Sequence, residues 1–203
     1  MTPTLTFRRA TARCLAEAGS AKASHGAQPA AEIIQRGELV ELRPLNADDW
    51  DVLYAVASDP VIWEQHPEPD RYRADVFCRF FQGALDSGGA FVVLDRDTGK
   101  VIGSSRYFGY DETHREIEIG WTFLARSHWG GRYNTEMKHL MLRHAFRFVD
   151  TVLFFVGPQN VRSQKSMERI GGIRSARRPD HHDGNSVVFS IDAASYARGA
   201  SPS

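Results

Sequence analysis

The clearest hydrophobic pattern lies in the middle of the chain. Residues 117–124 are mainly β-branched, aromatic or otherwise apolar, which predicts a buried strand. After a short polar loop, apolar residues recur at helical spacing from Tyr133 to Phe148, which predicts a helix. Gly120, inside the strand, indicates a bulge or a close approach to the backbone. The region is therefore predicted to form a strand, a glycine-bearing loop and a helix.

The same patterns predict the elements on either side. Strands are expected over 39–45, 90–94, 100–107 and 151–156, with a last hairpin over 173–177 and 186–191. Helices are expected over about 47–57, 75–85 and 160–170, with a short helical piece that begins at 61. Because strands and helices are mixed along the chain, the expected fold class is α/β (α+β).

Composition agrees with one folded domain, since 42% of the 203 residues are hydrophobic and 25% are charged. We expect this domain to span 37–197. Residues 1–36 are rich in Ala, Ser, Thr and Arg, which predicts a poorly ordered N-terminal extension, and 198–203 are expected to form a flexible tail. The arginines of the extension also resemble an organelle transit peptide, although a variable extension or a misassigned start is the preferred interpretation.

Charge and cysteine content narrow the class of protein. Lys plus Arg and Asp plus Glu both number 25, so no broad basic field is expected and nucleic acid is not a predicted partner. No apolar run approaches the roughly 20 residues of a membrane span, so no membrane association is predicted. Cys14 and Cys78 are far apart in sequence and are predicted to be free thiols in a reducing compartment, which favours the cytoplasm.

The loop before the central helix has the chemistry of an anion site. The N–H groups at a helix start are free, and the helix dipole favours negative charge there. Gly130 and Gly131 let those N–H groups face a phosphate without a β-carbon in the way. Arg126 and Arg132 add positive charge. The alternative is a tight turn before a helix with no ligand.

Six short motifs occur along the chain in a fixed order. They are Leu42-Arg43-Pro44-Leu45, Asp59-Pro60-Val61-Ile62-Trp63, Val101-Ile102-Gly103, Glu118-Ile119-Gly120-Trp121, the loop and helix start over 129–136, and Asn160-Val161-Arg162-Ser163 leading to Ile170-Gly171-Gly172. In this order and at these spacings, the sequence resembles the GCN5-related N-acetyltransferases (GNAT) over roughly residues 38–192. Within that family it looks most like the branch that includes the ribosomal-protein N-terminal acetyltransferases.

The resemblance implies the GNAT fold and its co-substrate. The fold would be a mixed central sheet of about six to seven strands with about four flanking helices. Its central strand and the strand at 153–156 would be a splayed parallel pair, with the pantetheine arm of acetyl-CoA between them. The pyrophosphate would lie on residues 128–134. The resemblance implies no metal, and a homodimer is an open alternative to a monomer.

The resemblance also implies an activity, namely N-acetyl transfer from acetyl-CoA to a primary amine. The acceptor would be a protein N-terminus or a small-molecule amine, and attack would be direct, within a ternary complex. The alternative is a non-catalytic acyl-CoA-binding or interaction module of the same fold.

Candidate site residues follow from the matched positions. Glu118 is the candidate general base, with Glu116 two residues back on the same face of the strand; both could instead pair with arginines or face solvent. Ser163 is a candidate to protonate or hydrogen-bond the leaving thiolate, although a helix-capping serine is an equal alternative. The candidate cofactor-binding residues are Trp121, Thr122, Phe123, His128, Trp129, Gly130, Gly131, Arg132, Tyr133, Asn134, Asn160 and Ser163.

Two features depart from the family pattern. The usual positions of the phosphate loop fall on Trp129, Arg132 and Asn134, so that a glycine and a small residue are both replaced. Met167 stands where many members carry a tyrosine that acts as general acid. A methionine has no proton to donate, and these departures motivate the non-catalytic alternative.

Three histidine-bearing positions complete the candidates. Asp180-His181-His182-Asp183 contains ligand-type residues, but its spacing matches no zinc signature and a solvated loop is the preferred interpretation. His66 and His114 could line an acceptor cleft, although packing or surface roles are the simpler alternatives.

Overall fold

The computed structural model describes residues 34–175 and 185–199, and one mixed sheet of eight strands runs through them. The strands lie in the order β1-β2-β3-β4-β5-β6-β8-β7. Their bounds are β1 (Gln35–Arg36), β2 (Val40–Pro44), β3 (Ala90–Asp95), β4 (Val101–Asp111), β5 (Glu116–Leu124), β6 (Thr151–Val156), β7 (Ile173–Arg174) and β8 (Val187–Asp192).

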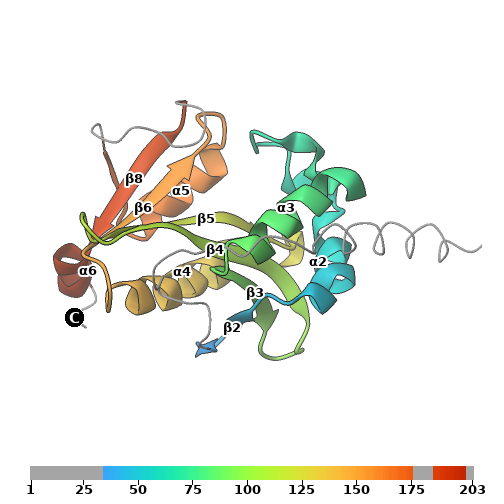
Figure 1. Ribbon diagram of the computed structural model, residues 1–203, viewed down its shortest axis with the longest axis horizontal. Coiled ribbons are helices and arrows are strands. Elements are labelled where there is room, and N and C mark those ends of the chain that lie inside the picture. Colours follow the sequence, from blue (N-terminus) through green and yellow to red (C-terminus); the bar gives the residue numbers. More distant parts are fainter. Residues whose placement is uncertain (1–33, 176–184, 200–203) are drawn as a thin grey trace, which may run out of the picture.

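Helices cover both faces of this sheet (Figure 1). Their bounds are α2 (Trp50–Ala57), α3 (Ala74–Asp86), α4 (Arg132–Ala145), α5 (Val161–Arg169) and α6 (Ala193–Gly199), with short 3-10 turns η1 (Ala47–Asp49), η2 (Pro60–Ile62), η3 (Pro69–Tyr72) and η4 (Arg126–His128). Apolar residues of α4 and α5 pack with most of the sheet in one core. Residues of α2, η2 and α3 form a second core, which is rich in aromatic rings.

The predicted mixed α/β fold is confirmed, with small differences in its elements. Eight strands replace the expected six to seven, and five helices replace the expected four within the described residues. The extra strand, β1, has two residues, and the extra helix, α6, follows the last strand. The helix α4 ends at Ala145, earlier than expected, and Phe148 of the predicted apolar stripe is 37% exposed.

The parallel strands β5 and β6 separate along their length, as expected for a splayed pair. They pair only from Glu116 opposite Thr151 to Glu118 opposite Leu153, and then both strands continue apart. A bulge in β5 begins just beyond this point, because β5 advances three residues while β4 advances two. Trp121 takes up the extra residue with a φ of +50°, next to the glycine that predicted the bulge.

One prediction about the cysteines is wrong. Cys78 is disulfide-bonded, so it is not a free thiol, and the argument from thiols for a reducing compartment does not hold. Cys14 and the segment Asp180-His181-His182-Asp183 lie outside the described residues, as do residues 1–33 of the predicted extension.

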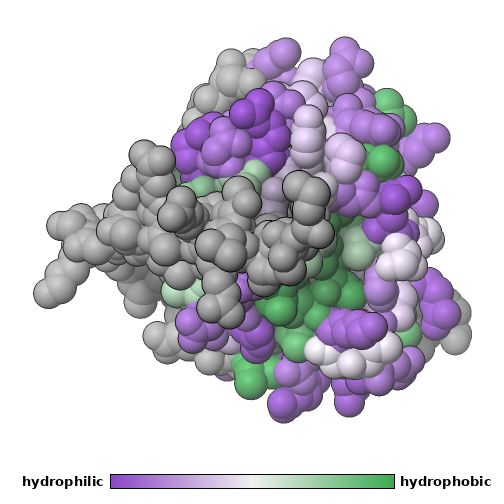
Figure 2. Space-filling view, turned by 90° about the vertical axis from the view of Figure 1, so that its right-hand side faces the viewer, coloured by the Kyte–Doolittle hydropathy of each residue, from purple (hydrophilic) through white to green (hydrophobic). Residues whose placement is uncertain are grey.

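The surface over α2 and α3 is mainly polar, with an apolar area near its centre (Figure 2). No helix that the structure describes has both the length and the hydropathy needed to cross a bilayer.

Candidate active site

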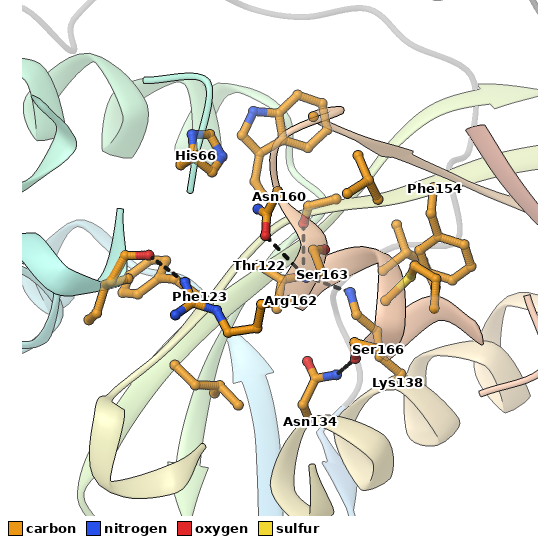
Figure 3. A pocket seen from close by; sticks show the side chains of 18 of the residues that line it. His66, Thr122, Phe123, Asn134, Lys138, Phe154, Asn160, Arg162, Ser163 and Ser166 are labelled. Carbon is orange, nitrogen blue, oxygen red and sulfur yellow. Dashed lines mark hydrogen bonds between the residues drawn. The ribbon is translucent and has the colours of Figure 1, made fainter. Parts of the chain in front are cut away.

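A cavity of about 690 Å³ opens where β5 and β6 separate. Residues from both strands, from the start of α4 and from α5 form its walls, and the segment 62–71 closes one side. Figure 3 shows side chains from these elements converging on it. The cavity therefore joins the predicted splay, the predicted anion loop and the segment after α2.

Most candidate residues line this cavity. They are Glu118, Trp121, Thr122, Phe123, His128, Trp129, Gly130, Gly131, Asn134, Asn160 and Ser163. Arg132 and Tyr133 lie outside its lining, because α4 turns them away at its first positions. Arg132 lines a neighbouring hollow that also includes Gly37 and Glu136.

The loop that begins α4 needs glycine at two positions. Gly130 and Gly131 have φ values of +104° and +107°, a backbone conformation that residues with a β-carbon rarely adopt. A β-carbon on Gly131 would also lie 2.6 Å from Nη1 of Arg169. Arg169 of α5 therefore reaches over this loop, beside the free N–H groups of α4. Sequence reasoning missed it because it comes from another helix.

Two candidate residues hold the loop against β3. Asp95 lies within 3.0 Å of His128 Nε2, and the Tyr133 hydroxyl donates to the same carboxylate over 3.2 Å. The backbone N–H of Thr98, with these side-chain hydrogen bonds, lowers the pKa of Asp95 to about 2. This carboxylate thus anchors the loop while His128 still borders the cavity.

Trp129 joins the loop to α5. Its indole Nε1 donates to the backbone carbonyl of Leu124 over 2.9 Å, and the Arg162 guanidinium lies 3.8 Å from its ring centroid. Arg162 in turn donates to the carbonyl of Ile62 over 3.1 Å (Figure 3). By contrast, Arg126, expected to add charge at this site, is paired with Asp59 outside the cavity lining.

Glu118 is buried in β5 and lines the cavity. Its carboxylate lies over Gly120, where a β-carbon would come within 2.7 Å of Oε1. This contact gives a second reason for a glycine at that position, besides the bulge. Glu116 is equally buried but lies outside the cavity lining, so the two carboxylates predicted to share a face do not share the cavity.

The start of α5 brings polar groups to the opposite wall. Asn160 caps the helix as predicted, since its Oδ1 accepts the backbone N–H of Ser163 over 3.0 Å. The Ser163 side chain lines the cavity. Nearby, Asn134 Nδ2 of α4 donates to Ser166 Oγ over 2.6 Å, and this bond links the two helices (Figure 3).

Lys138 is a residue that sequence reasoning missed. It lies in the middle of α4 with 2% of its surface exposed, and it lines the cavity. Its Nζ donates to Thr122 Oγ1 over 2.6 Å and to Ser105 Oγ over 3.4 Å, beside the Phe154 ring (Figure 3). Burial lowers the pKa of Lys138 to about 7, although the charge of Glu118 acts in the opposite direction.

The segment 62–71 forms the remaining wall with Trp63, His66, Glu68 and Arg71. Burial and the neighbouring Arg71 lower the pKa of His66 to about 3, which favours a neutral imidazole. Arg71 Nε donates to Glu68 over 2.8 Å. The second candidate histidine, His114, lies elsewhere and pairs with Asp111. Of the two histidines, the cavity includes His66 alone.

Comparison with known proteins adds an independent finding. A family model described as acetyltransferase (GNAT) domain matches residues 40–173. Among curated proteins, no sequence matches this chain.

Solved structures share the fold at low sequence identity. One is a GCN5-related N-acetyltransferase from Brucella melitensis, with 24% identity, a TM-score of 0.68 and coverage of 82% of this chain and 81% of that one. Another, from Vibrio cholerae, is named for a ribosomal-protein-serine acetyltransferase, with 19% identity, a TM-score of 0.64 and coverage of 80% and 99%. A third is spermidine N-acetyltransferase from Vibrio cholerae, in complex with CoA and spermine, with 18% identity, a TM-score of 0.60 and coverage of 79% and 99%.

Proposed function

The chain belongs to the GNAT acetyltransferase family, and from this premise we propose that it transfers an acetyl group from acetyl-CoA to a primary amine. The observation that carries the proposal is the cavity where β5 and β6 separate, directly beside the glycine loop at the start of α4. The transfer proposed is direct, with donor and acceptor bound together.

The residues of the loop fit a CoA diphosphate. The first N–H groups of α4 are free to bind an anion, and the positive φ values of Gly130 and Gly131 shape the backbone before them. Arg169 adds a guanidinium over the loop, and Lys165 also lines the cavity. Beyond Glu118, the ladder between β5 and β6 stops within the described residues, and polar groups of the pantetheine arm are proposed to lie between the two strands there.

Glu118 is the proposed general base. An amine attacks a thioester only as the neutral amine, so a proton must leave its nitrogen. Glu118 lines the cavity at the point where the strands part, and residues of the loop and of the segment 62–71 line the same cavity. The wall formed by Trp63 and His66 is the proposed acceptor side, because the loop of α4 is assigned to the CoA diphosphate.

The acceptor itself is proposed only as a class. A primary amine agrees with the spermidine N-acetyltransferase among the similar structures, whose complex holds spermine. A peptide N-terminus agrees equally with the structure named for a ribosomal-protein-serine acetyltransferase.

Two measurements test the proposal. Binding of acetyl-CoA to the folded protein alone raises the thermal midpoint, by about 2.7 kcal/mol of stabilisation at a hundredfold excess over Kd. Gly131→Ala should abolish most of this rise, because the new β-carbon meets Arg169 and strains the loop. Gly109→Ala is the matched control, because Gly109 also has a positive φ but lies outside the cavity lining.

Turnover then separates catalysis from simple binding. We expect acetyl transfer to at least one member of a panel of peptide N-termini, lysine peptides and polyamines. Glu118→Gln should lower kcat by on the order of 10²–10⁴-fold without loss of acetyl-CoA binding. Glu116→Gln, at an equally buried position outside the cavity lining, should leave kcat nearly unchanged. Acetyl-CoA binding without turnover on any amine would favour the non-catalytic alternative.

A further inference from the structure

Lys138 and Glu118 approach the cavity from opposite faces of the sheet. Ile117 and Ile119 pack into the core beneath α4, so Glu118 between them projects toward the other face. That face carries α2, α3 and the wall that contains Trp63. Lys138 comes from α4 itself. The opening between β5 and β6 connects the two faces, and both side chains line it.

The position of Lys138 along α4 places it away from the anion loop. It is seven residues after Gly131, which corresponds to about 10 Å of helix. Its ammonium therefore borders the part of the cavity about two helical turns beyond the anion loop, which a thioester extending from the loop would reach. The Phe154 ring lies beside this ammonium, Met167 also lines the cavity, and neither side chain has an acidic proton.

We propose that Lys138 is the catalytic acid of this site, giving its proton to the sulfur of the departing CoA. The inference rests on the proposed acetyl transfer. In the step, the amine nitrogen forms a bond to the acyl carbon and loses a proton to Glu118. The carbon–sulfur bond breaks, its electron pair stays on sulfur, and Nζ of Lys138 supplies the proton that makes the neutral thiol. Proton exchange with water then returns Glu118 to the carboxylate and Lys138 to the ammonium.

The surroundings suit an ammonium that gives up its proton readily. Burial lowers the pKa of Lys138 to about 7, below the roughly 8.5 of an ordinary thiol, so transfer to a thiolate is downhill. From β5, the charge that acts on it is Glu118, and Thr122 offers a hydroxyl. From β4, Ser105 offers a hydroxyl. Arg106 of β4 is also charged, and burial lowers its pKa to about 10, although the charge of Glu118 acts in the opposite direction. From β6, the neighbour is the neutral ring of Phe154.

The test compares kcat, acetyl-CoA binding and pH dependence in the full-length protein. Lys138→Met keeps the length of the side chain and removes the proton, so kcat should fall on the order of 10²–10⁴-fold while acetyl-CoA still raises the thermal midpoint. Lys138→Arg keeps the positive charge but cannot release a proton, so it should not restore the rate. Lys100→Met, at an exposed lysine outside the cavity lining, should retain the activity of the unmodified protein. Ser163→Ala, at the other candidate acid, distinguishes the two assignments.

The pH profile of the unmodified protein provides a readout that a structural role would not change. With saturating amine, kcat/KM for acetyl-CoA should fall as pH rises above about 7, because Lys138 then loses its proton. In Lys138→Met this fall should be absent. A profile of the unmodified protein that stays level above pH 7 overturns the proposal, even if the variants do not fold. Restored activity in Lys138→Arg, or loss only in Ser163→Ala, also overturns it. Absence of turnover by the unmodified protein overturns the proposed function, and the assignment of Lys138 with it.

Discussion

Replacing Lys138 by methionine is expected to stabilise the folded protein while it removes activity. The lysine is 2% exposed, and both of its hydrogen-bond acceptors, Thr122 and Ser105, are uncharged hydroxyls. A buried ammonium is costly unless it is well paired. Methionine fits the same space beside the Phe154 ring, and the hydroxyls of Thr122 and Ser105 remain bonded to each other over 2.8 Å.

The pKa of Lys138 determines how large the gain in stability of Lys138→Met should be. It falls from an ordinary value of 10.5 to about 7, and each pKa unit corresponds to about 1.36 kcal/mol. Holding the charged form of Lys138 in the folded protein therefore costs about 5 kcal/mol. At pH 7, where the folded group is half neutral, Lys138 still lowers the free energy of unfolding by about 4 kcal/mol. This is an upper limit for the gain, because methionine also loses the hydrogen bonds.

The lowered pKa of Lys138 also determines how the stability of the folded protein changes with pH. Between about pH 7 and 10 the unfolded lysine binds a proton and the folded lysine does not, so the stability of the unmodified protein rises with pH in this window. The penalty is complete below pH 7 and vanishes above the unfolded pKa. The advantage of Lys138→Met should therefore shrink by about 1.4 kcal/mol per pH unit from pH 7 to 10.

Urea unfolding at pH 6, 7, 8 and 9 measures this difference directly. Lys165→Met is the matched control, because Lys165 is exposed on α5 and its replacement should give a small, pH-independent change. A Lys138→Met protein less stable than the unmodified one at pH 7 would refute the reasoning. An advantage that stays constant from pH 7 to 9 would refute it as well.

Three further changes test other contacts. Gly120→Ala should displace the Glu118 carboxylate, which lies 2.7 Å from the new β-carbon, and lower kcat at least tenfold; a normal rate with an unchanged thermal midpoint would contradict this. Arg169→Met should weaken acetyl-CoA binding, measured by calorimetry, by about 1.5–3 kcal/mol as a charge-assisted contact is lost, whereas unchanged Kd would remove Arg169 from the phosphate site. Glu136→Gln should cost about 2 kcal/mol in urea unfolding, because its carboxylate accepts the N–H groups of residues 38, 39 and 40 over 2.7–2.8 Å; a loss below about 0.5 kcal/mol would argue against these bonds.

Periodicity and local motifs were sufficient to predict most of the fold. Strand β6 was predicted with its observed bounds, because its run of apolar residues is unbroken. The bulge in β5 was predicted from Gly120 and lies one residue further on, at Trp121. Strand β1 was not predicted, since two residues are too few for an alternating pattern. Its pairing depends on contacts with residues distant in sequence.

The site was predictable where residues are neighbours in sequence and less so elsewhere. Arg169 could not be placed over Gly131 without the packing of α5 against α4. Lys138 did leave a signal, because it shares helical spacing with the buried Met141, Leu142 and Ala145. A lysine on an apolar stripe is usually exposed at the stripe's edge, and only the opening between β5 and β6 gives this one a polar environment.

The carboxylate of Glu136 also connects two parts of the chain that are distant in sequence. It sits in the first turns of α4, five residues after Gly131, and it holds the amides of residues 38–40 at the start of β2. A ligand that orders the beginning of α4 should therefore slow hydrogen–deuterium exchange at those amides, although they do not line the cavity. The exchange rate of the amides of residues 38–40 thus reports whether a ligand is bound at the phosphate loop.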